Sequence, residues 1–454
     1  MARSQNATNG ITEGVIWKSL LAFFFPIMLG TLFQQLYNTV DTVIVGQFVG
    51  TQALAAVGGS AAQILNLIIG FFVGVSSGAT VIVSQFFGAH DDEGVHRAVH
   101  TAMALAVIGG AIMTVLGLAF APTLLRWMDT PADTMEDSTL YLRIVFLAMI
   151  PSMIYNVGAS IQRAVGDSKR PLYFLIICCL VNVALDLLFV MGMKMGVTGV
   201  AVATAIAQIV SAVLTCTSLG RAQESYRLEL RKVRADARLL GETVRIGLPT
   251  GLQSVMYALS NMIITTTING FGTNTVAAWV ALGKVDGMFW MILSAFGVSI
   301  MTFVGQNYGA HRYDRVHRSL RVCIGLSLGA SWLFSALFLI FGRSVYRLFT
   351  TEEAVLEIAV KMMLYMAPCY WLFVPIELLS GALRGMGDTL VPTIITAVGI
   401  CVLRVVWMFT VVPAWHEIFA ITVSYPISWI LTAGAFIIYY NHAKRRLIPQ
   451  GGAE

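Results

Sequence analysis

Long apolar segments dominate this chain of 454 residues and limit what it can fold into. A helix needs roughly 20 mostly apolar residues to cross a hydrocarbon core of about 30 Å. Charged residues make up only 12% of the chain, whereas a soluble domain carries about 25%. The sequence predicts an all-α integral membrane protein with about twelve transmembrane helices, near 18–45, 53–83, 98–122, 139–162, 171–193, 197–219, 244–270, 276–304, 319–341, 356–382, 392–412 and 416–440. No segment shows the ten-residue alternation of a membrane barrel.

Basic residues outside these spans are distributed unevenly between the two sides. With the N-terminus placed in the cytoplasm, about 21 Lys and Arg fall on the cytoplasmic side and about 6 on the outer side. Cytoplasmic loops carry the excess of positive charge in membrane proteins. We therefore expect a multi-pass protein of the plasma (inner) membrane with both termini in the cytoplasm.

The chain also contains an internal repeat. The segment SQFFGAHDDEGVHR at 84–97 returns as GQNYGAHRYDRVHR at 305–318, a shift of 221 (305 − 84 = 221). The same shift relates RAVGDSKRP at 163–171 to RGMGDTLVP at 384–392. Each half holds six spans, so the two repeats are parallel, as in transporters whose lobes rock around a central site.

This repeat divides the chain into two lobes. We expect an N-lobe over 1–219, a cytoplasmic linker over 220–243, a C-lobe over 244–440 and a cytoplasmic tail over 441–454. The basic residues of the linker are expected to be solvated or held near anionic lipid. We expect the protein to be a monomer surrounded by lipid and to bind no nucleic acid.

Polar side chains inside the first span form the first candidate site. Gln34, Tyr37, Asn38 and Asp41 follow helical spacing and form one stripe on an otherwise apolar helix. Ionisable groups inside spans are rare and usually functional. The repeat does not contain this acid, because the shifts of 221 and 222 lead to Met262 and Ile263. The alternative is an aspartate that caps a broken helix near Gly46.

The fifth span supplies a second polar cluster. Asn182 and Asp186 are four residues apart and share a helix face, and Thr204 in the next span offers a hydroxyl. Two carboxylates brought together in a low dielectric favour binding of a proton near neutral pH. The alternative is a polar contact between helices that only packs the bundle, worth about 0.6 kcal/mol.

In the second half, Lys284, Asp286, Glu377 and Arg404 lie within spans. Glu377 stands one repeat shift from Asn156 (377 − 221 = 156), and both are candidates to line a substrate cavity, together with Gln34, Tyr37, Asn38 and the aromatic Tyr257. A Glu377–Arg404 ion pair is the alternative. Lys284 and Asp286 are two apart and cannot face each other on a helix.

The repeated loop motifs indicate hinges or gates rather than catalysis. Glycine is expected to close the turns, Asp167 and Asp388 to cap the following helices, and proline to occupy their first turns. The candidate hinge residues are Gly88, Arg163, Asp167, Gly309, Arg384 and Asp388. No nucleotide-binding loop or metal-ligand spacing occurs, so we expect neither an enzyme nor a cofactor.

Together these segments resemble the multidrug and toxic compound extrusion (MATE) family of cation-coupled exporters. The resemblance is carried by LFQQLYNTVDTVIVGQFVG, the GAH…VHR and RxxGD…P loops of both halves, and NVALDLLFVMGMKMGVTGVAVAT. It implies twelve helices in two lobes that form a V, and export of organic cations or drugs in exchange for inward H⁺ or Na⁺. It also implies that Asp41, Asn182, Asp186 and Thr204 form the cation site of the N-lobe.

The hypothesis is antiport by alternating access, with H⁺ or Na⁺ bound at Asp41, Asn182 and Asp186. One alternative is a flippase for lipid-linked precursors of the same superfamily, which should show more cationic residues along its cavity. Another is an uncoupled, channel-like membrane protein, in which an Asp41→Asn variant would keep its activity.

Overall fold

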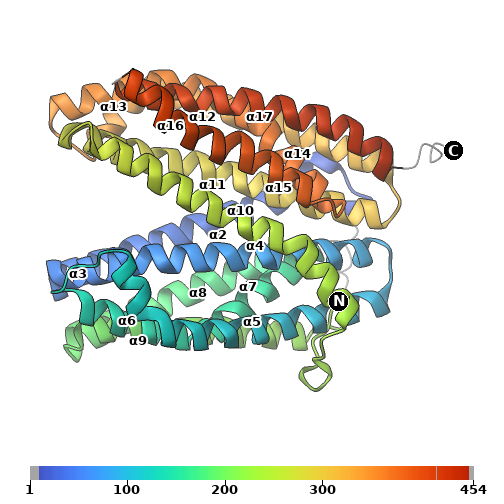
Figure 1. Cartoon of the computed structure of the whole chain (residues 1–454). Helices are drawn as coiled ribbons and strands as arrows, with labels where there is room; N and C mark the ends of the chain where they lie inside the picture. Colours follow the sequence, from blue (N-terminus) through green and yellow to red (C-terminus); the bar gives the residue numbers. More distant parts are fainter. Residues whose placement is uncertain (1–9, 416, 449–454) are drawn as a thin grey trace. The chain divides into compact units, whose positions relative to one another are not determined.

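A computed structural model describes residues 10–415 and 417–448, and every regular element within these ranges is helical (Figure 1). Ten of the described helices are long and apolar enough to cross a membrane. An eleventh span is the pair α6 (Met135–Leu147) and α7 (Met149–Ala164), bent by 51° at the break between them. The 33-residue helix α10 (Ala237–Asn269) occupies the place of the seventh predicted span, although its polar side chains keep it out of that apolar set. The predicted all-helical membrane architecture is confirmed.

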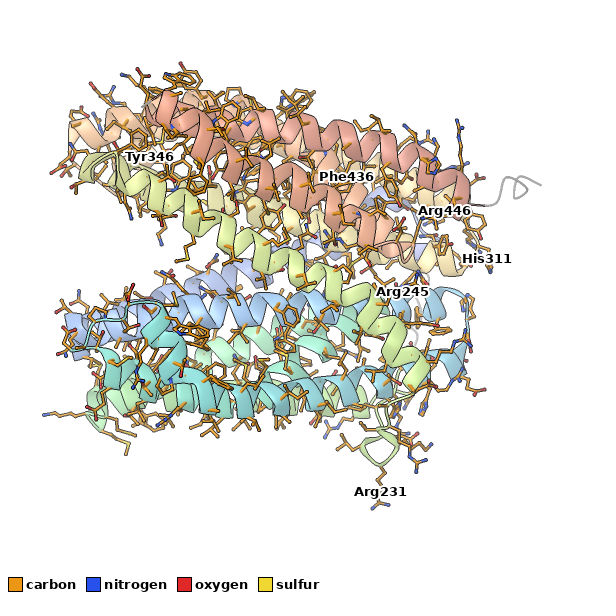
Figure 2. The ribbon with its side chains drawn as sticks, viewed as in Figure 1. Arg231, Arg245, His311, Tyr346, Phe436 and Arg446 are labelled. Atoms are coloured by element: carbon orange, nitrogen blue, oxygen red, sulfur yellow. The ribbon has the colours of Figure 1, made fainter. Side chains whose placement is uncertain are left out.

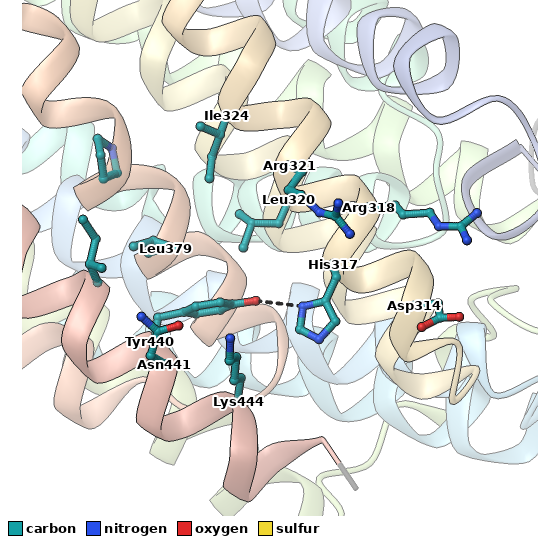
Figure 3. Close-up of a pocket in the computed structure, with 12 residues that line it drawn as sticks. Asp314, His317, Arg318, Leu320, Arg321, Ile324, Leu379, Tyr440, Asn441 and Lys444 are labelled. Atoms are coloured by element: carbon teal, nitrogen blue, oxygen red, sulfur yellow. Dashed lines mark hydrogen bonds between the residues drawn. The ribbon is translucent and has the colours of Figure 1, made fainter. Parts of the chain in front are cut away.

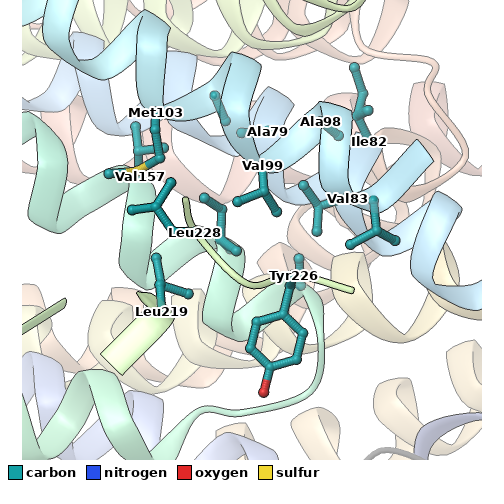
Figure 4. Close-up of a cluster of buried hydrophobic side chains, with 14 of the residues drawn as sticks. Ala79, Ile82, Val83, Ala98, Val99, Met103, Val157, Leu219, Tyr226 and Leu228 are labelled. Atoms are coloured by element: carbon teal, nitrogen blue, oxygen red, sulfur yellow. The ribbon is translucent and has the colours of Figure 1, made fainter. Parts of the chain in front are cut away.

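The first compact unit runs from Phe25 to Gly251. It holds most of α2 (Ile16–Ile44), η1 (Val45–Val49), α3 (Thr51–Gly58), α4 (Ser60–Gly88), α5 (Asp92–Trp127), α6, α7, α8 (Lys169–Asp186), η2 (Leu187–Gly192), α9 (Gly196–Gly220), η3 (Leu230–Lys232) and the first turns of α10. Small and branched side chains of α4, α5 and α7 form a buried core in this unit, which Figure 4 shows around Val99 and Val157.

The linker between the repeats contributes to that core. Tyr226 and Leu228 are buried among the α4, α5 and α7 side chains, while the basic residues around them remain exposed. Arg231 points away from the ribbon in Figure 2. The linker charges are thus exposed, as expected, but its apolar residues fix the segment against the first repeat.

The second compact unit contains the described residues before Phe25 and those from Leu252 onward. It holds the start of α2, the rest of α10, α11 (Thr273–Gly309), α12 (Tyr313–Tyr346), α13 (Glu353–Met366), η4 (Ala367–Phe373), α14 (Val374–Gly385), α15 (Leu390–Thr396), η5 (Ala397–Val402), α16 (Leu403–Ala414) and α17 (Ile418–Leu447). Phe24 of α2 stacks on Phe296 of α11 with ring centroids 4.0 Å apart. The first helix of each repeat therefore begins in the unit built mainly by the other repeat.

The backbone carries the same repeat as the sequence. His90 and His311 have φ angles of 55° and 54°, and Gly166 and Gly387 have φ angles of 94° and 87°. Each pair is separated by 221 residues, and positive φ is uncommon for a residue other than glycine. In the GAH turns the left-handed residue is the histidine, while the preceding glycine only ends the helix. The expectation that glycine closes this turn is therefore wrong, whereas it holds for Gly166 and Gly387.

Candidate functional site

Three helices of the first unit converge on a buried polar cluster. Tyr37 and Asp41 come from α2, Asn182 and Asp186 from α8, and Thr204 from α9. Asn182 and Asp186 are 0% exposed, and the carboxyl groups of Asp41 and Asp186 interact directly. The hydroxyl oxygens of Tyr37 and Thr204 lie 3.5 Å apart. The structure therefore brings together the four residues predicted to form the cation site.

The polar atoms of this cluster lack further partners. Apart from the contact between the two carboxyl groups, both oxygens of Asp186, both amide atoms of Asn182 and Oδ1 of Asp41 are buried without a hydrogen bond to any described residue. A buried polar group left unpaired costs about 1–3 kcal/mol, and more when it is charged. Two adjacent carboxylates in a low dielectric also repel each other. The cluster is thus suited to take up a proton or a small cation.

Irregular helical turns follow both acids. Asp186 is the last residue of α8 before the π-helical segment η2, and Asp41 lies four residues before the π-helical segment η1. Such wide turns are rare and frequently occur at functional sites. The alternative interpretation of Asp41 expected a broken helix near Gly46, which lies within η1, but nothing in the sequence analysis predicted the wide turn after Asp186.

Tyr141 of α6 is a member of the cluster that sequence analysis missed. Its side chain is buried and lies near both Asp41 and Asp186. One repeat shift away stands Met362, so this tyrosine, like Asp41, belongs to one half only (141 + 221 = 362). That asymmetry is the signal that could have found it.

Three other predicted residues lie apart from this cluster. Gln34 and Asn38 are exposed, although helical spacing places them on the same stripe as Tyr37 and Asp41. Asn156 donates from its Nδ2 atom to the backbone carbonyl of Ser152, 2.9 Å away within the same helix. The polar stripe predicted along the first span therefore divides into a buried part and an exposed part.

The second unit contains a cavity of about 550 Å³. Its charged lining consists of Asp286, Glu377 and Arg404, and aromatic rings form much of the remaining wall. The predicted Tyr257 and Glu377 both belong to it. The aromatic lining residues are Tyr257, Trp279, Trp290, Phe373 and Tyr425.

Asp286 is placed by an interaction that no sequence spacing indicated. The hydroxyl of Tyr370, in η4, donates to Oδ1 of Asp286 in α11. Tyr370 in turn stacks on Phe289 with centroids 4.4 Å apart. Lys284 is exposed, in agreement with the prediction that Lys284 and Asp286 do not face each other.

The alternative of a Glu377–Arg404 ion pair is wrong. Arg404 is directed toward α17, where its guanidinium lies 3.9 Å from the centroid of the Tyr425 ring and its Nε donates to Ser428 Oγ at 3.0 Å. Glu377 instead packs against Gly297, where a Cβ atom would collide with its carboxylate. Both charges line the cavity without neutralising each other through a direct bridge.

The loop residues predicted as hinges differ between the repeats. Oδ1 of Asp167 accepts backbone N–H bonds from Lys169 and Arg170 at 3.0 and 3.1 Å, which is the predicted cap of α8. Asp388 was predicted to cap the following helix in the same way. Its Oδ2 instead accepts hydrogen bonds from the Tyr439 hydroxyl at 2.5 Å and from Arg446 at 3.0 Å, both on α17.

The remaining hinge candidates follow the repeat. Arg163 Nη2 donates to Ser160 Oγ at 3.1 Å, and Arg384 Nη2 donates to Ser380 Oγ at 2.7 Å. Gly88 and Gly309 are the last residues of α4 and α11.

A helical membrane protein with two repeated halves and buried carboxylates belongs to the class of polytopic transporters. The family model MatE matches residues 26–188 and again residues 249–410, once in each half, with starts 223 residues apart (249 − 26 = 223). The chain therefore belongs to the MATE family of multidrug efflux transporters, which confirms the resemblance and the two-repeat fold.

Relatives and solved structures agree with this family. The chain is 28% identical to the "Probable multidrug resistance protein YoeA" of Bacillus subtilis over 94% of each chain. It is 24% identical to an "FAD transporter" of Shewanella oneidensis over 77% of this chain and 78% of that protein. Among solved structures, "Crystal structure of MATE in the bent conformation" matches with a TM-score of 0.91 at 21% identity, over 97% of this chain and 98% of that one.

Proposed function

We propose that this protein is a secondary active antiporter that exports small organic cations in exchange for inward H⁺ or Na⁺. The observation that carries the proposal is the buried contact between Asp41 and Asp186, whose remaining buried oxygens have no other described partner. In the proposed cycle the ion binds at this pair on the outer side, and the cation leaves the protein. On the inner side the ion is released and the next cation binds.

The ion site is supported by the chemistry of its ligands. The two carboxylates, the Asn182 amide oxygen and the Thr204 hydroxyl are the hard oxygen donors that a small cation requires. A proton shared between the carboxylates would equally remove their repulsion. The same residues therefore serve H⁺ or Na⁺, and gradient experiments have to distinguish the two ions.

The cavity of the second unit is our candidate for substrate binding. Asp286 and Glu377 outweigh Arg404, so its charged lining has a formal charge of −1 (+1 − 2 = −1). Aromatic faces attract organic cations, and Arg404 already makes such a contact with Tyr425. A cavity with one cationic residue favours an organic cation over the lipid-linked pyrophosphate expected for a flippase.

The driving force depends on stoichiometry. One H⁺ exchanged for one monovalent cation moves no net charge, so only the pH gradient contributes, at about 1.4 kcal/mol per pH unit. A second inward ion would add about 2.3 kcal/mol per 100 mV. We propose that the protein works as a monomer in the plasma membrane, with both termini cytoplasmic and without a cofactor.

The test is efflux of ethidium from vesicles with an imposed pH or Na⁺ gradient. Asp41→Asn and Asp186→Asn should each lower gradient-driven efflux at least tenfold. Asp129→Asn is the matched control, because Asp129 is exposed in the same unit and its positive φ suits asparagine. Efflux that responds to neither gradient would refute antiport. Normal efflux in both buried variants would refute the ion site alone.

Because one relative is named an FAD transporter, the substrate assay should include an anion. Tetraphenylphosphonium and FAD are measured in the same vesicles. Transport of FAD without transport of the cation would contradict the proposed substrate class and leave the coupling site untouched.

A further inference from the structure

The VHR motif of each repeat lies in the first turns of the third membrane span of that half. In the first unit it places His96 and Arg97 on α5, with His100 one turn further on. In the second unit it places His317 and Arg318 on α12, with Arg321 in the position of His100 (321 − 221 = 100). Both copies lie at the end of the helices that the basic-residue bias predicts to be cytoplasmic.

In the first unit this motif binds anions supplied by the chain itself. Oε1 of Glu229 lies 3.7 Å from His96 Nε2, and the backbone N–H of Glu229 donates to His100 Nε2 at 3.0 Å. Oδ2 of Asp236 lies 3.9 Å from Arg97 Nη1. The linker thus presents two carboxylates to the motif.

The second unit places a lysine where the linker of the first repeat begins (444 − 221 = 223). Helix α17 continues to Leu447, six residues past the point equivalent to the end of α9 (220 + 221 = 441; 447 − 441 = 6). That extension carries Lys444. Figure 3 shows Lys444, Tyr440 and His317 close together, with Arg318 and Arg321 on the same helix as His317. The Tyr440 hydroxyl lies 3.5 Å from His317 Nδ1.

These residues line a cavity of about 660 Å³ between α12, α14 and α17. Its cationic residues outnumber its acids, because Arg318, Arg321 and Lys444 face only Asp314. None of these three forms an ion pair with another residue in the described part of the chain. The fully charged side chains of its lining thus carry a formal charge of +2 (3 − 1 = 2).

The other end of the cavity is apolar. Along α12 the lining passes from Arg318 to Ile324, and along α17 from Lys444 to Ile437, with Leu379 of α14 between them. Seven residues separate Lys444 from Ile437, which corresponds to about 10 Å along the helix axis. A charged end at the membrane surface and an apolar end toward its interior match the polarity of a lipid. A free phosphate would not use the apolar half.

We propose that the cavity between α12, α14 and α17 binds an anionic phospholipid. The phosphate is held by Arg318, Arg321 and Lys444, since guanidinium and ammonium groups are the phosphate binders of proteins. One acyl chain lies along Ile324, Leu379 and Ile437. Basic pockets between helices at the cytoplasmic side are known to bind anionic headgroups. This inference does not depend on the proposed antiport.

The experiment measures lipid bound to the purified full-length protein by native mass spectrometry. Phosphatidylglycerol and phosphatidylcholine of equal chain length are the probes. The variant Arg318→Gln/Arg321→Gln/Lys444→Gln should bind phosphatidylglycerol at least tenfold more weakly. The control Arg343→Gln/Arg347→Gln/Lys361→Gln removes the same charge elsewhere in the second unit and should change binding less than twofold.

A second variant keeps the charges and narrows the apolar end. Ile437→Trp, at a position 48% exposed and therefore tolerant of the change, should also weaken binding of phosphatidylglycerol. The proposal is overturned by undiminished binding in the Arg318 triple variant, by equal losses in both triple variants, or by equal retention of phosphatidylcholine. Displacement of the lipid by inorganic phosphate at equal concentration would show a phosphate site. A severalfold gain in phosphatidylglycerol binding after deletion of 449–454 would show that this tail occupies the cavity. That result would also overturn the proposal.

Discussion

Replacing Gly247 by alanine should destabilise the first unit, although alanine favours helices. Gly247 of α10 is buried against α4, where an added Cβ would lie 2.8 Å from the backbone C and Cα atoms of Val75. Carbon atoms normally approach to about 3.5–4.0 Å, so the two helices have to separate by close to 1 Å. Overpacking of this kind costs about 1–3 kcal/mol, and the gain in helix propensity returns about 0.5–1 kcal/mol. With the middle of each range, the expected net loss is about 1 kcal/mol.

Gly241 provides a matched control on the same helix. It is exposed, and a Cβ there would meet nothing within 4 Å, so Gly241→Ala should stabilise the protein by up to about 1 kcal/mol. A thiol-reactive dye can follow thermal unfolding, because the free cysteines Cys178, Cys323 and Cys401 are buried. At about 2–4 °C per kcal/mol, Gly247→Ala should lower the midpoint and Gly241→Ala should raise it. Equal or higher stability of Gly247→Ala would refute the close α4–α10 approach.

Three further predictions concern charges. Asp186→Asn should raise the thermal midpoint, because it removes one of two buried like charges, and it should abolish gradient-driven efflux. A lower midpoint in the same dye assay would contradict the repulsion between the two carboxylates. Arg404→Met should tighten the binding of tetraphenylphosphonium several-fold, because it exposes the Tyr425 ring and makes the cavity more negative. The affinity is measured by titration with fluorescence quenching. An unchanged affinity would show that the cation binds elsewhere. The hydrogen bond from Lys232 lowers the pKa of Glu229, and the nearby His96 acts in the same direction. The contacts of the Glu229 carboxylate therefore stabilise the linker above the usual glutamate pKa. This stabilisation is lost as the pH falls through the lowered pKa. Cleavage of the linker by an acid-active protease should therefore rise in that range, and a protease active at neutral pH should cleave Glu229→Gln faster than the native chain.

Sequence analysis predicted the features that depend on local chemistry. The spans followed from apolar length, and the repeat followed from polar loop residues at a constant shift. Asp41, Asn182 and Asp186 were found because an ionisable or amide group inside a span is costly and because four-residue spacing places side chains on one face. These arguments need no knowledge of which helices touch.

The features that were missed depend on contacts between distant segments. Tyr141 joins the buried polar cluster only because the fold brings its side chain near Asp41 and Asp186, and Tyr370 reaches Asp286 across 84 residues of chain. The Glu377–Arg404 alternative failed for the same reason, since the face that Arg404 presents is decided by Tyr425 and Ser428 on α17.

The duplication constrains the backbone of the two halves but leaves the chemistry of their buried side chains free to differ. The left-handed turns at His90 and His311 recur because each must end one long helix and reverse the chain, a demand on the backbone that both halves share. The buried acids do not recur: the shift leads from Asp41 to Met262 and from Asp286 to Leu65. Side-chain chemistry has therefore diverged on a common backbone. If ions bind in the first unit and organic cations in the second, α2 and α10 are the candidates to couple the two sites, because each of these helices has residues in both units. Substitutions on these two helices that spare both sites should then uncouple efflux from the gradient without abolishing the binding of either ligand.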